Sequence, residues 1–220
     1  MNNNVLILAN GKGTRFKDDY PDTPKPLIRY KNLSLIDWAH KSILDSSLAK
    51  NHNITVISNS ETTLKHAETH LKCNAFKIKP TNSPAETLLE SSKIWNYWEN
   101  FYTVDCDVAF KFSVSYDNKE HFLPTAISSN PAYSYVEIKE SQIINILEKK
   151  VISNNAVIGV YPFNTAMLKQ YFNGSLYREN YLKREIYLSD LLRYQISKGM
   201  RIRPIICDEF KPLGVPSDLN

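Results

Sequence analysis

The chain has 220 residues, enough for one domain that buries a full core without disulfides or structural metals. Its 42% hydrophobic and 23% charged residues exclude collagen, coiled coil and general disorder. The net charge of +4 suits an anionic small ligand but is too small to indicate a nucleic-acid partner.

The cysteines and the N-terminus indicate a cytoplasmic protein. Three cysteines without a C-x-x-C pair argue against a disulfide framework and a thiolate zinc site. His66 and His70 lie four residues apart without a third ligand, so a polar helix face is favoured over zinc. We expect no signal peptide and no membrane partner, because the N-terminus has no basic leader and no apolar stretch approaches eighteen residues.

The first half of the chain alternates strands and helices. Residues 5–9 form a short apolar run typical of a buried parallel strand. Residues 33–48 have helical spacing, with Ser34 as a predicted N-cap and Asp37 in the first turn. There follow a predicted strand at 54–57, helix at 61–71, strand at 76–78, helix at 83–98 and strand at 101–104.

The pattern changes after residue 120, where strands dominate. We predict strands at 133–138, 143–147 and 156–163, a helix at 187–198 ended by Gly199, and a last strand at 200–206. The prediction is therefore one α/β domain over residues 1–220. It has a Rossmann-like mixed, mostly parallel central sheet in a nucleotide-binding half (about 1–115) and a smaller β-rich lobe in the second half (about 116–220).

Glycine is scarce, with six in the chain, and two of the six follow the first strand closely. Gly11 and Gly13 would let backbone N–H groups approach an anion, with Lys12 and Arg15 adding positive charge. Lys25 follows between two prolines, which stiffen its backbone. The segment lacks the Walker A pattern and the third glycine of the dinucleotide fingerprint, so neither motif applies.

The motif G-x-G-T-R at 11–15 followed by P-K-P-L at 24–27 resembles the nucleotide-sugar pyrophosphorylase family, the sugar-phosphate nucleotidyltransferases with a GT-A-like fold. Segments 82–88, 104–110, 148–149, 155–161 and 212–219 continue the resemblance. Two positions depart from the family pattern. Asn10 replaces a small residue, and Pro212 stands where many relatives have a second metal aspartate, for which Asp208 or Glu209 is a candidate substitute.

The resemblance implies a role for each matching residue. Arg15 would stabilise the departing pyrophosphate, Lys25 would bridge the α-phosphate and the attacking phosphate, and Asp107 would hold Mg²⁺. Asp105 would be a second metal ligand or a neighbour of the metal ligand, and a solvent or N-cap role is equally open. The implied nucleotide-binding residues are Leu8, Ala9, Asn10, Gly11, Lys12, Gly13, Thr14, Ser83, Thr87 and Asp105.

On the acceptor side, the resemblance implies Glu148, Lys149 and Gly159. A surface ion pair is the alternative for Glu148 and Lys149. Five tyrosines in the second half could line a sugar pocket or an oligomer contact, so a homo-oligomer stays open: Tyr133, Tyr135, Tyr177, Tyr181 and Tyr187. For the aromatic residues between 95 and 102, core packing is favoured over base stacking.

The implied activity is Mg²⁺-dependent transfer of NMP from an NTP to a sugar 1-phosphate or similar phosphorylated small molecule, for capsule or surface-glycan precursor synthesis. One alternative is a cytidylyltransferase for a non-sugar phosphate such as phosphocholine, because the chain lacks the long C-terminal extensions of many sugar enzymes. Another is a catalytically silent nucleotide-sugar-binding regulatory protein, suggested by Pro212 and Asn10. A glycosyltransferase is a weaker reading, based on Asp105-x-Asp107.

Overall fold

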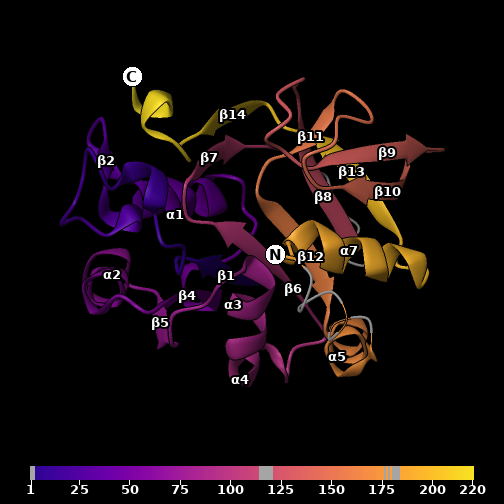
Figure 1. Cartoon of the computed structure of the whole chain (residues 1–220), viewed down its shortest axis with the longest axis horizontal. Helices are drawn as coiled ribbons and strands as arrows, with labels where there is room; N and C mark the ends of the chain where they lie inside the picture. Colours follow the sequence, from indigo (N-terminus) through magenta and orange to yellow (C-terminus); the bar gives the residue numbers. More distant parts are fainter. Residues whose placement is uncertain (1–2, 114–120, 176, 178, 180–183) are drawn as a thin grey trace.

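A five-stranded sheet lies at the centre of the molecule (Figure 1). The computed structural model describes residues 3–113, 121–175, 177, 179 and 184–220. The strand order is β12-β6-β1-β4-β5, and all neighbours are parallel except β12. The predicted mixed, mostly parallel sheet is confirmed. Its strands are β1 (Asn4–Leu8), β4 (Ile54–Ser58), β5 (Asn74–Lys77), β6 (Asn100–Asp105) and β12 (Val160–Asn164).

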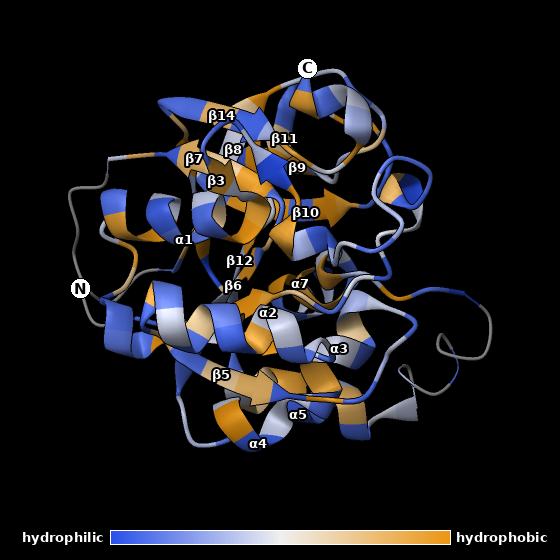
Figure 2. Cartoon of the chain, turned by 90° about the vertical axis from the view of Figure 1, so that its left-hand side faces the viewer, coloured by the Kyte–Doolittle hydropathy of each residue, from blue (hydrophilic) through white to orange (hydrophobic). Residues whose placement is uncertain are grey.

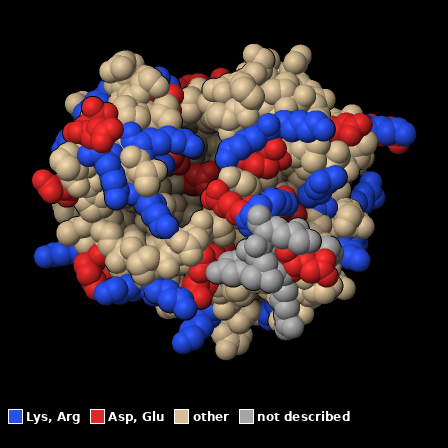
Figure 3. All heavy atoms as spheres, viewed as in Figure 1, with Lys and Arg blue, Asp and Glu red and all other residues tan. Residues whose placement is uncertain are grey.

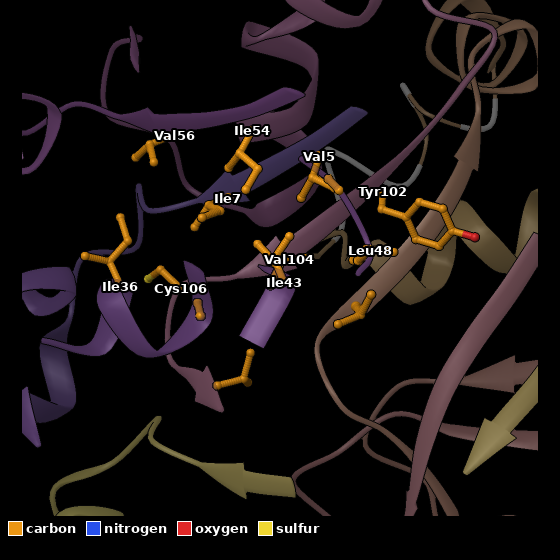
Figure 4. Packing of buried hydrophobic residues seen from close by; sticks show 14 of the residues in the cluster. Val5, Ile7, Ile36, Ile43, Leu48, Ile54, Val56, Tyr102, Val104 and Cys106 are labelled. Carbon is orange, nitrogen blue, oxygen red and sulfur yellow. The ribbon is translucent and has the colours of Figure 1, made fainter. Parts of the chain in front are cut away.

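Helices cover both faces of this sheet, which explains the continuous apolar run of β1. Val5 and Ile7 pack under α1 (Leu35–Asp45) and α2 (Glu61–His66), as Figure 4 shows in part. Leu6 and Leu8 join a second apolar cluster on the opposite face, because side chains alternate along a strand. The helices of that face are α3 (Pro84–Glu90), α4 (Ser92–Trp95), α5 (Thr165–Asn173) and α7 (Leu188–Ser197). Figure 2 shows the apolar strands behind helices with mixed polarity.

The predicted start of α1 is confirmed in detail. Ser34 and Asp37 form a capping box, in which the Ser34 hydroxyl accepts from the Asp37 N–H and the Asp37 carboxylate accepts from the Ser34 N–H. The predicted helix 61–71 is α2 continued by a π-helical turn, Ala67–Leu71. The predicted helix 83–98 is interrupted at Ser91, where α3 ends and α4 begins.

A second five-stranded sheet forms the other lobe, in the order β10-β9-β11-β8-β13. Strand β8, which lies between β11 and β13, was not predicted, because it contains Pro124, which is unfavourable inside a sheet. Helix α5 was also missed. The boundary predicted near residue 115 lies outside the described residues. The strands are β8 (His121–Ile127), β9 (Tyr135–Lys139), β10 (Gln142–Leu147), β11 (Asn155–Val157) and β13 (Ile202–Ile206).

Gly159 lets the chain pass from one sheet to the other. The single strand predicted at 156–163 is wrong, because β11 belongs to the second sheet and β12 to the central sheet. Gly159 has φ +83°, a conformation that disfavours residues with a Cβ, and its carbonyl accepts from the Asp105 N–H at 2.8 Å. The switch therefore brings Gly159 against the end of β6.

An antiparallel ribbon brings the C-terminal segment to the chain that follows β6. Strand β7 (Val108–Lys111) pairs with β14 (Glu209–Pro212), and the Leu213 N–H donates to the Asp107 carbonyl at 2.9 Å. The last turn, Pro216–Leu219, follows. A short ribbon also joins β2 (Arg29–Tyr30) to β3 (Leu33–Ser34). Within the described residues, no helix has the length and apolar character needed to cross a membrane.

The close fit at Gly159 predicts a large effect of Gly159→Ala. A Cβ there would lie 2.8 Å from Asp105 Oδ2, in addition to the strain of positive φ. Gly199 is a matched control, because it has φ +91° and open space around its Cβ position. We expect Gly199→Ala to lower Tm by about 2–4 °C, for roughly 1 kcal/mol of backbone strain. Gly159→Ala should lower it by at least twice as much, and equal losses in thermal unfolding would contradict this packing.

Candidate active site

Three adjoining cavities lie at the carboxyl ends of β1 and β6, where ligands bind in open α/β sheets. The loop after β1 lines the first two cavities, of about 320 and 370 Å³. The third, of about 260 Å³, lies toward the second sheet and the C-terminal segment. Asp105 and Asp107 line both the second and the third cavity, so these two cavities meet at the end of β6.

All the residues that the sequence assigned to the nucleotide line the first or the second cavity. Seven of these ten residues belong to the loop 8–14, and Ser83 and Thr87 approach from the start of α3. Lys12 Nζ donates to Asn82 Oδ1 at 3.0 Å, so the glycine loop is connected to the segment before α3. Glu185 also lines the second cavity, and no sequence motif indicated it.

Asn10 connects the loop after β1 to the segment before α3 by hydrogen bonds. Its side chain is 5% exposed, and Nδ2 donates to Thr81 Oγ1 at 2.7 Å and to the Lys79 carbonyl at 3.3 Å. Thr81 Oγ1 also lies 2.6 Å from Thr87 Oγ1. The amide that departs from the family pattern thus fixes the distance between the loop after β1 and the start of α3.

Lys25 and Asp107 form an ion pair between the glycine loop and the end of β6. Lys25 Nζ lies 2.5 Å from Asp107 Oδ2, and each side chain is 18% exposed. Burial is the largest single effect and lowers the pKa of Lys25, but Asp107, Cys106 and Asp105 together outweigh it, so the pKa rises above its usual value. Gly13, with φ +61°, makes this approach possible, because a Cβ there would lie 2.8 Å from Lys25 Cβ.

Asp105 lines the second cavity with this pair and lies against Gly159. Burial raises the pKa of its carboxyl to about 8, the negative charge of Asp107 raises the pKa further, and Lys25 opposes the increase. Asp105 therefore keeps its proton at neutral pH when no cation is bound. A bound divalent cation would favour the ionised form.

The third cavity holds the predicted acceptor residues Glu148 and Gly159, together with Arg15. Glu148 Oε2 accepts from Ser134 Oγ and, at 2.7 Å, from Ser189 Oγ, which fixes the carboxylate. Arg15 lines this cavity rather than the two nucleotide-side cavities. The contact between Arg15 and the departing pyrophosphate therefore stays a prediction.

Lys149 does not line any of the three cavities among the described residues. Its Nζ donates to the Tyr187 hydroxyl at 2.7 Å on the surface, and the Tyr187 hydroxyl donates to Glu185. Among the other tyrosines singled out from the sequence, Tyr133 lines the acceptor-side cavity and Tyr135 is buried. Tyr177 packs on Tyr171 and Phe172, and Tyr181 lies outside the described residues.

The prediction that Asp208 or Glu209 could replace the aspartate missing at Pro212 is wrong. Pro212 pairs with Val108, whereas Glu209 pairs with Lys111, three positions further along the ribbon, or about 10 Å. Asp208 and Glu209 therefore lie away from Asp107, and Asp218 lines the acceptor-side cavity instead. The described part of the chain contains no group of three or more His, Cys, Asp or Glu that could hold a metal.

Comparisons with known proteins agree with this geometry. No protein-family model matches the chain. The chain is similar to the bifunctional protein GlmU of Sulfurovum sp., with 23% identity over 234 residues, covering 100% of this chain and 52% of that protein. The chain thus spans about half the length of the curated relatives it matches.

Solved structures share the fold. A nucleoside-diphosphate-sugar pyrophosphorylase from Vibrio cholerae aligns with a TM-score of 0.78 and 19% identity, covering 97% of this chain and 96% of that one. The inositol-1-phosphate CTP transferase of T. maritima aligns with a TM-score of 0.78 and 20% identity, covering 100% and 92%. The resemblance predicted from the motifs is thereby confirmed at the level of sequence similarity and fold.

The two loop glycines should respond differently to a methyl group. A Cβ at Gly11 meets open space, so Gly11→Ala should keep Tm within about 1 °C, while weakening triphosphate binding at least tenfold if phosphates contact this backbone. Gly13→Ala should lower both Tm and affinity, because it displaces Lys25. Calorimetric titration and thermal unfolding test both variants, and an unchanged affinity in Gly11→Ala would place the phosphates elsewhere.

The raised pKa of Asp105 predicts a pH-dependent stability. Between about pH 4 and pH 8 the folded chain holds a proton that the unfolded chain has released, so the free energy of unfolding falls as pH rises. Asp105→Asn removes this loss and should raise Tm at pH 8 by about 3 °C in metal-free buffer. The exposed Asp208→Asn is the control, and equal Tm profiles of Asp105→Asn and wild type between pH 5 and 8.5 would refute the assignment.

Proposed function

We propose that this chain, which is similar in sequence to GlmU and in fold to nucleotide-sugar pyrophosphorylases, transfers NMP from an NTP to a phosphorylated small molecule. In the proposed reaction an acceptor phosphate oxygen attacks the α-phosphorus of the NTP and forms a new P–O bond. The bond between the α-phosphorus and the oxygen that bridges to the β-phosphorus breaks, and pyrophosphate leaves with that electron pair. The protein then needs no nucleophile, and it acts by positioning and charge neutralisation.

The Lys25–Asp107 pair is the observation that carries the proposal. Lys25 lines both nucleotide-side cavities, and Asp107 lines the second of these and the acceptor-side cavity. The α-phosphate and the attacking phosphate would therefore meet at this pair. Lys25 would exchange its carboxylate partner for phosphate oxygens and neutralise the charge that develops there. Backbone N–H groups of the glycine loop would hold the β- and γ-phosphates.

The carboxylates at the end of β6 fit a magnesium ion. Asp107 and, once ionised, Asp105 are hard oxygen ligands in the wall shared by the second and third cavities. Two protein carboxylates suffice for Mg²⁺ when substrate phosphates and waters complete its coordination. Bound there, Mg²⁺ would neutralise phosphate charge and orient the two substrates.

We also propose a cytoplasmic setting in which the product serves capsule or surface-glycan synthesis, as the resemblance implies. The acceptor would be a sugar 1-phosphate or a similar small phosphate. Oligomeric assembly is a separate proposal that sedimentation can test.

The direct test is pyrophosphate release. ATP, CTP, GTP, UTP and dTTP would each be combined with Mg²⁺ and a panel of phosphorylated acceptors, and thermal shifts would be recorded in parallel. Turnover of at least one pair is expected, and a ligand at a hundred times its Kd should stabilise the fold by roughly 2.7 kcal/mol. Binding without turnover would favour a silent regulatory protein, and no shift with any nucleotide would contradict the proposal.

Lys25→Ala should lower kcat/KM about 100-fold, which corresponds to roughly 3 kcal/mol of transition-state stabilisation. The matched control is Lys93→Ala on α4, an exposed lysine that lines none of the three cavities. Lys93→Ala should change kcat/KM less than threefold. An unchanged kcat/KM in Lys25→Ala, measured on the best substrate pair, would remove Lys25 from the mechanism.

A further inference from the structure

The Glu185 carboxylate lines the second cavity together with the glycine loop and the start of α3. The backbone on both sides of it is fixed. Ile186, the next residue, is 1% exposed, and its carbonyl accepts from the Ala85 N–H of α3 at 3.4 Å. Arg184, the residue before, donates twice to the Asp190 carboxylate of α7, at 2.8 Å each. Glu185 therefore reaches the cavity from a segment that is attached to both helices.

A chain of hydrogen bonds between side chains holds the Glu185 carboxylate. The Tyr187 hydroxyl donates to Glu185 Oε2 at 2.6 Å and accepts from Lys149 Nζ at 2.7 Å. Lys149 Nζ also lies 4.3 Å from the centroid of the Tyr187 ring. Burial and the hydrogen bond to Glu185 raise the pKa of Tyr187, so the hydroxyl keeps the proton that it donates. Hydrogen bonds in such a chain polarise and strengthen one another.

The second oxygen of this carboxylate has no partner within the described part of the chain. Tyr187 donates to Oε2, and none of the described residues donates to Oε1. An ionised carboxylate only accepts hydrogen bonds, and it repels the phosphate oxygens of a nucleotide. Figure 3 shows Lys and Arg along the edges of a central hollow with acidic atoms inside it. The triphosphate would pair with the cations, and Oε1 would accept from an uncharged donor of the ligand.

The position of Glu185 favours the ribose as this donor. Among the three cavities, Glu185 lines the second, which contains the glycine loop at one part of its wall and Ser83 and Thr87 at another. With the phosphates at the glycine loop, the ribose is the next part of the nucleotide. Its 2′- and 3′-hydroxyls are adjacent donors, and an acidic side chain is a suitable acceptor for them.

We propose that Glu185 distinguishes ribonucleotides from deoxyribonucleotides by accepting hydrogen bonds from the ribose hydroxyls, and that Tyr187 and Lys149 position its carboxylate. This inference rests on the proposed nucleotidyl transfer and names the sugar of its nucleotide. The same chain of hydrogen bonds gives Lys149 a positioning role that is separate from the acceptor contact expected of it.

The test compares each ribonucleotide with its 2′-deoxy and 3′-deoxy forms. ATP, CTP, GTP, UTP and these forms are assayed for kcat/KM with Mg²⁺ and the best acceptor of the panel, and calorimetric titration gives their Kd. The best ribonucleotide should have a kcat/KM at least tenfold above that of one or both of its deoxy forms. Tenfold corresponds to about 1.4 kcal/mol, close to the lower end for a hydrogen bond to a charged group.

Glu185→Ala removes the acceptor and should lower this preference at least fivefold. Loss of the carboxylate also removes a repulsion toward phosphate, but that effect acts on both nucleotides and cancels in their ratio. The matched control is Glu68→Ala, an exposed glutamate on the turn Ala67–Leu71 that lines none of the three cavities. It should leave the preference unchanged.

Tyr187→Phe tests the positioning role, because it keeps the ring beside Lys149 and removes the hydroxyl. The preference should fall at least twofold, with a larger loss for the ribonucleotide than for the deoxynucleotide. A merely structural role would lower Tm and change kcat/KM of both nucleotides alike. Tyr97→Phe, at a side chain that is 91% exposed, is the control. Circular dichroism and Tm show whether each variant is folded.

The outcomes separate the two proposals. Equal use of a ribonucleotide and both its deoxy forms, or best use of a deoxynucleotide such as dTTP, would overturn the ribose contact while leaving nucleotidyl transfer intact. A preference that survives Glu185→Ala would overturn the role of Glu185. If Glu185→Ala instead abolishes a preference for an acceptor over its own deoxy analogue, the carboxylate binds the acceptor and the ribose assignment is wrong.

Absence of turnover with every NTP and acceptor would count against nucleotidyl transfer itself. The calorimetric titrations would then still decide the ribose contact, because they compare the Kd of ribonucleotides and deoxynucleotides without any reaction.

Discussion

The ion pair between Lys25 and Asp107 is the contact around which the site is arranged. It joins the loop after β1 to the end of β6, and its short distance requires a glycine at position 13. A partly buried ammonium and a partly buried carboxylate are each costly alone, so the pair holds both in the wall of the cavities. The same two side chains separate the basic nucleotide side from the acidic acceptor side.

Segments remote in sequence complete the surroundings of this pair. Gly159 comes from the strand switch between the sheets and presses on Asp105, and Leu213 comes from the C-terminal ribbon and bonds to the Asp107 backbone. Gly159 contacts the Asp105 side chain, and Leu213 holds the backbone of Asp107. The positions of the two carboxyl groups therefore depend on the packing of both lobes.

The residues that line the cavities differ in charge. Lysines and glycine backbone line the first cavity, whereas carboxyl groups and aromatic rings line the third. The amide of Asn10 connects two loops that line the first and second cavities. The departure from the family pattern thus has a structural role of its own.

The sequence by itself determined the features that arise from local pattern. The apolar run of β1, the Ser34 cap with Asp37, the glycine loop and Lys25 between its prolines all depend on neighbours within a few residues. The tertiary structure alone decided that the predicted strand 156–163 divides at Gly159, that Lys149 turns to Tyr187, and that Asp218 rather than Asp208 or Glu209 faces the cavity. The reason is that register and sheet membership are set by contacts between residues about 50 to 100 positions apart, such as Gly159 with Asp105 and Pro212 with Val108, for which no local signal exists.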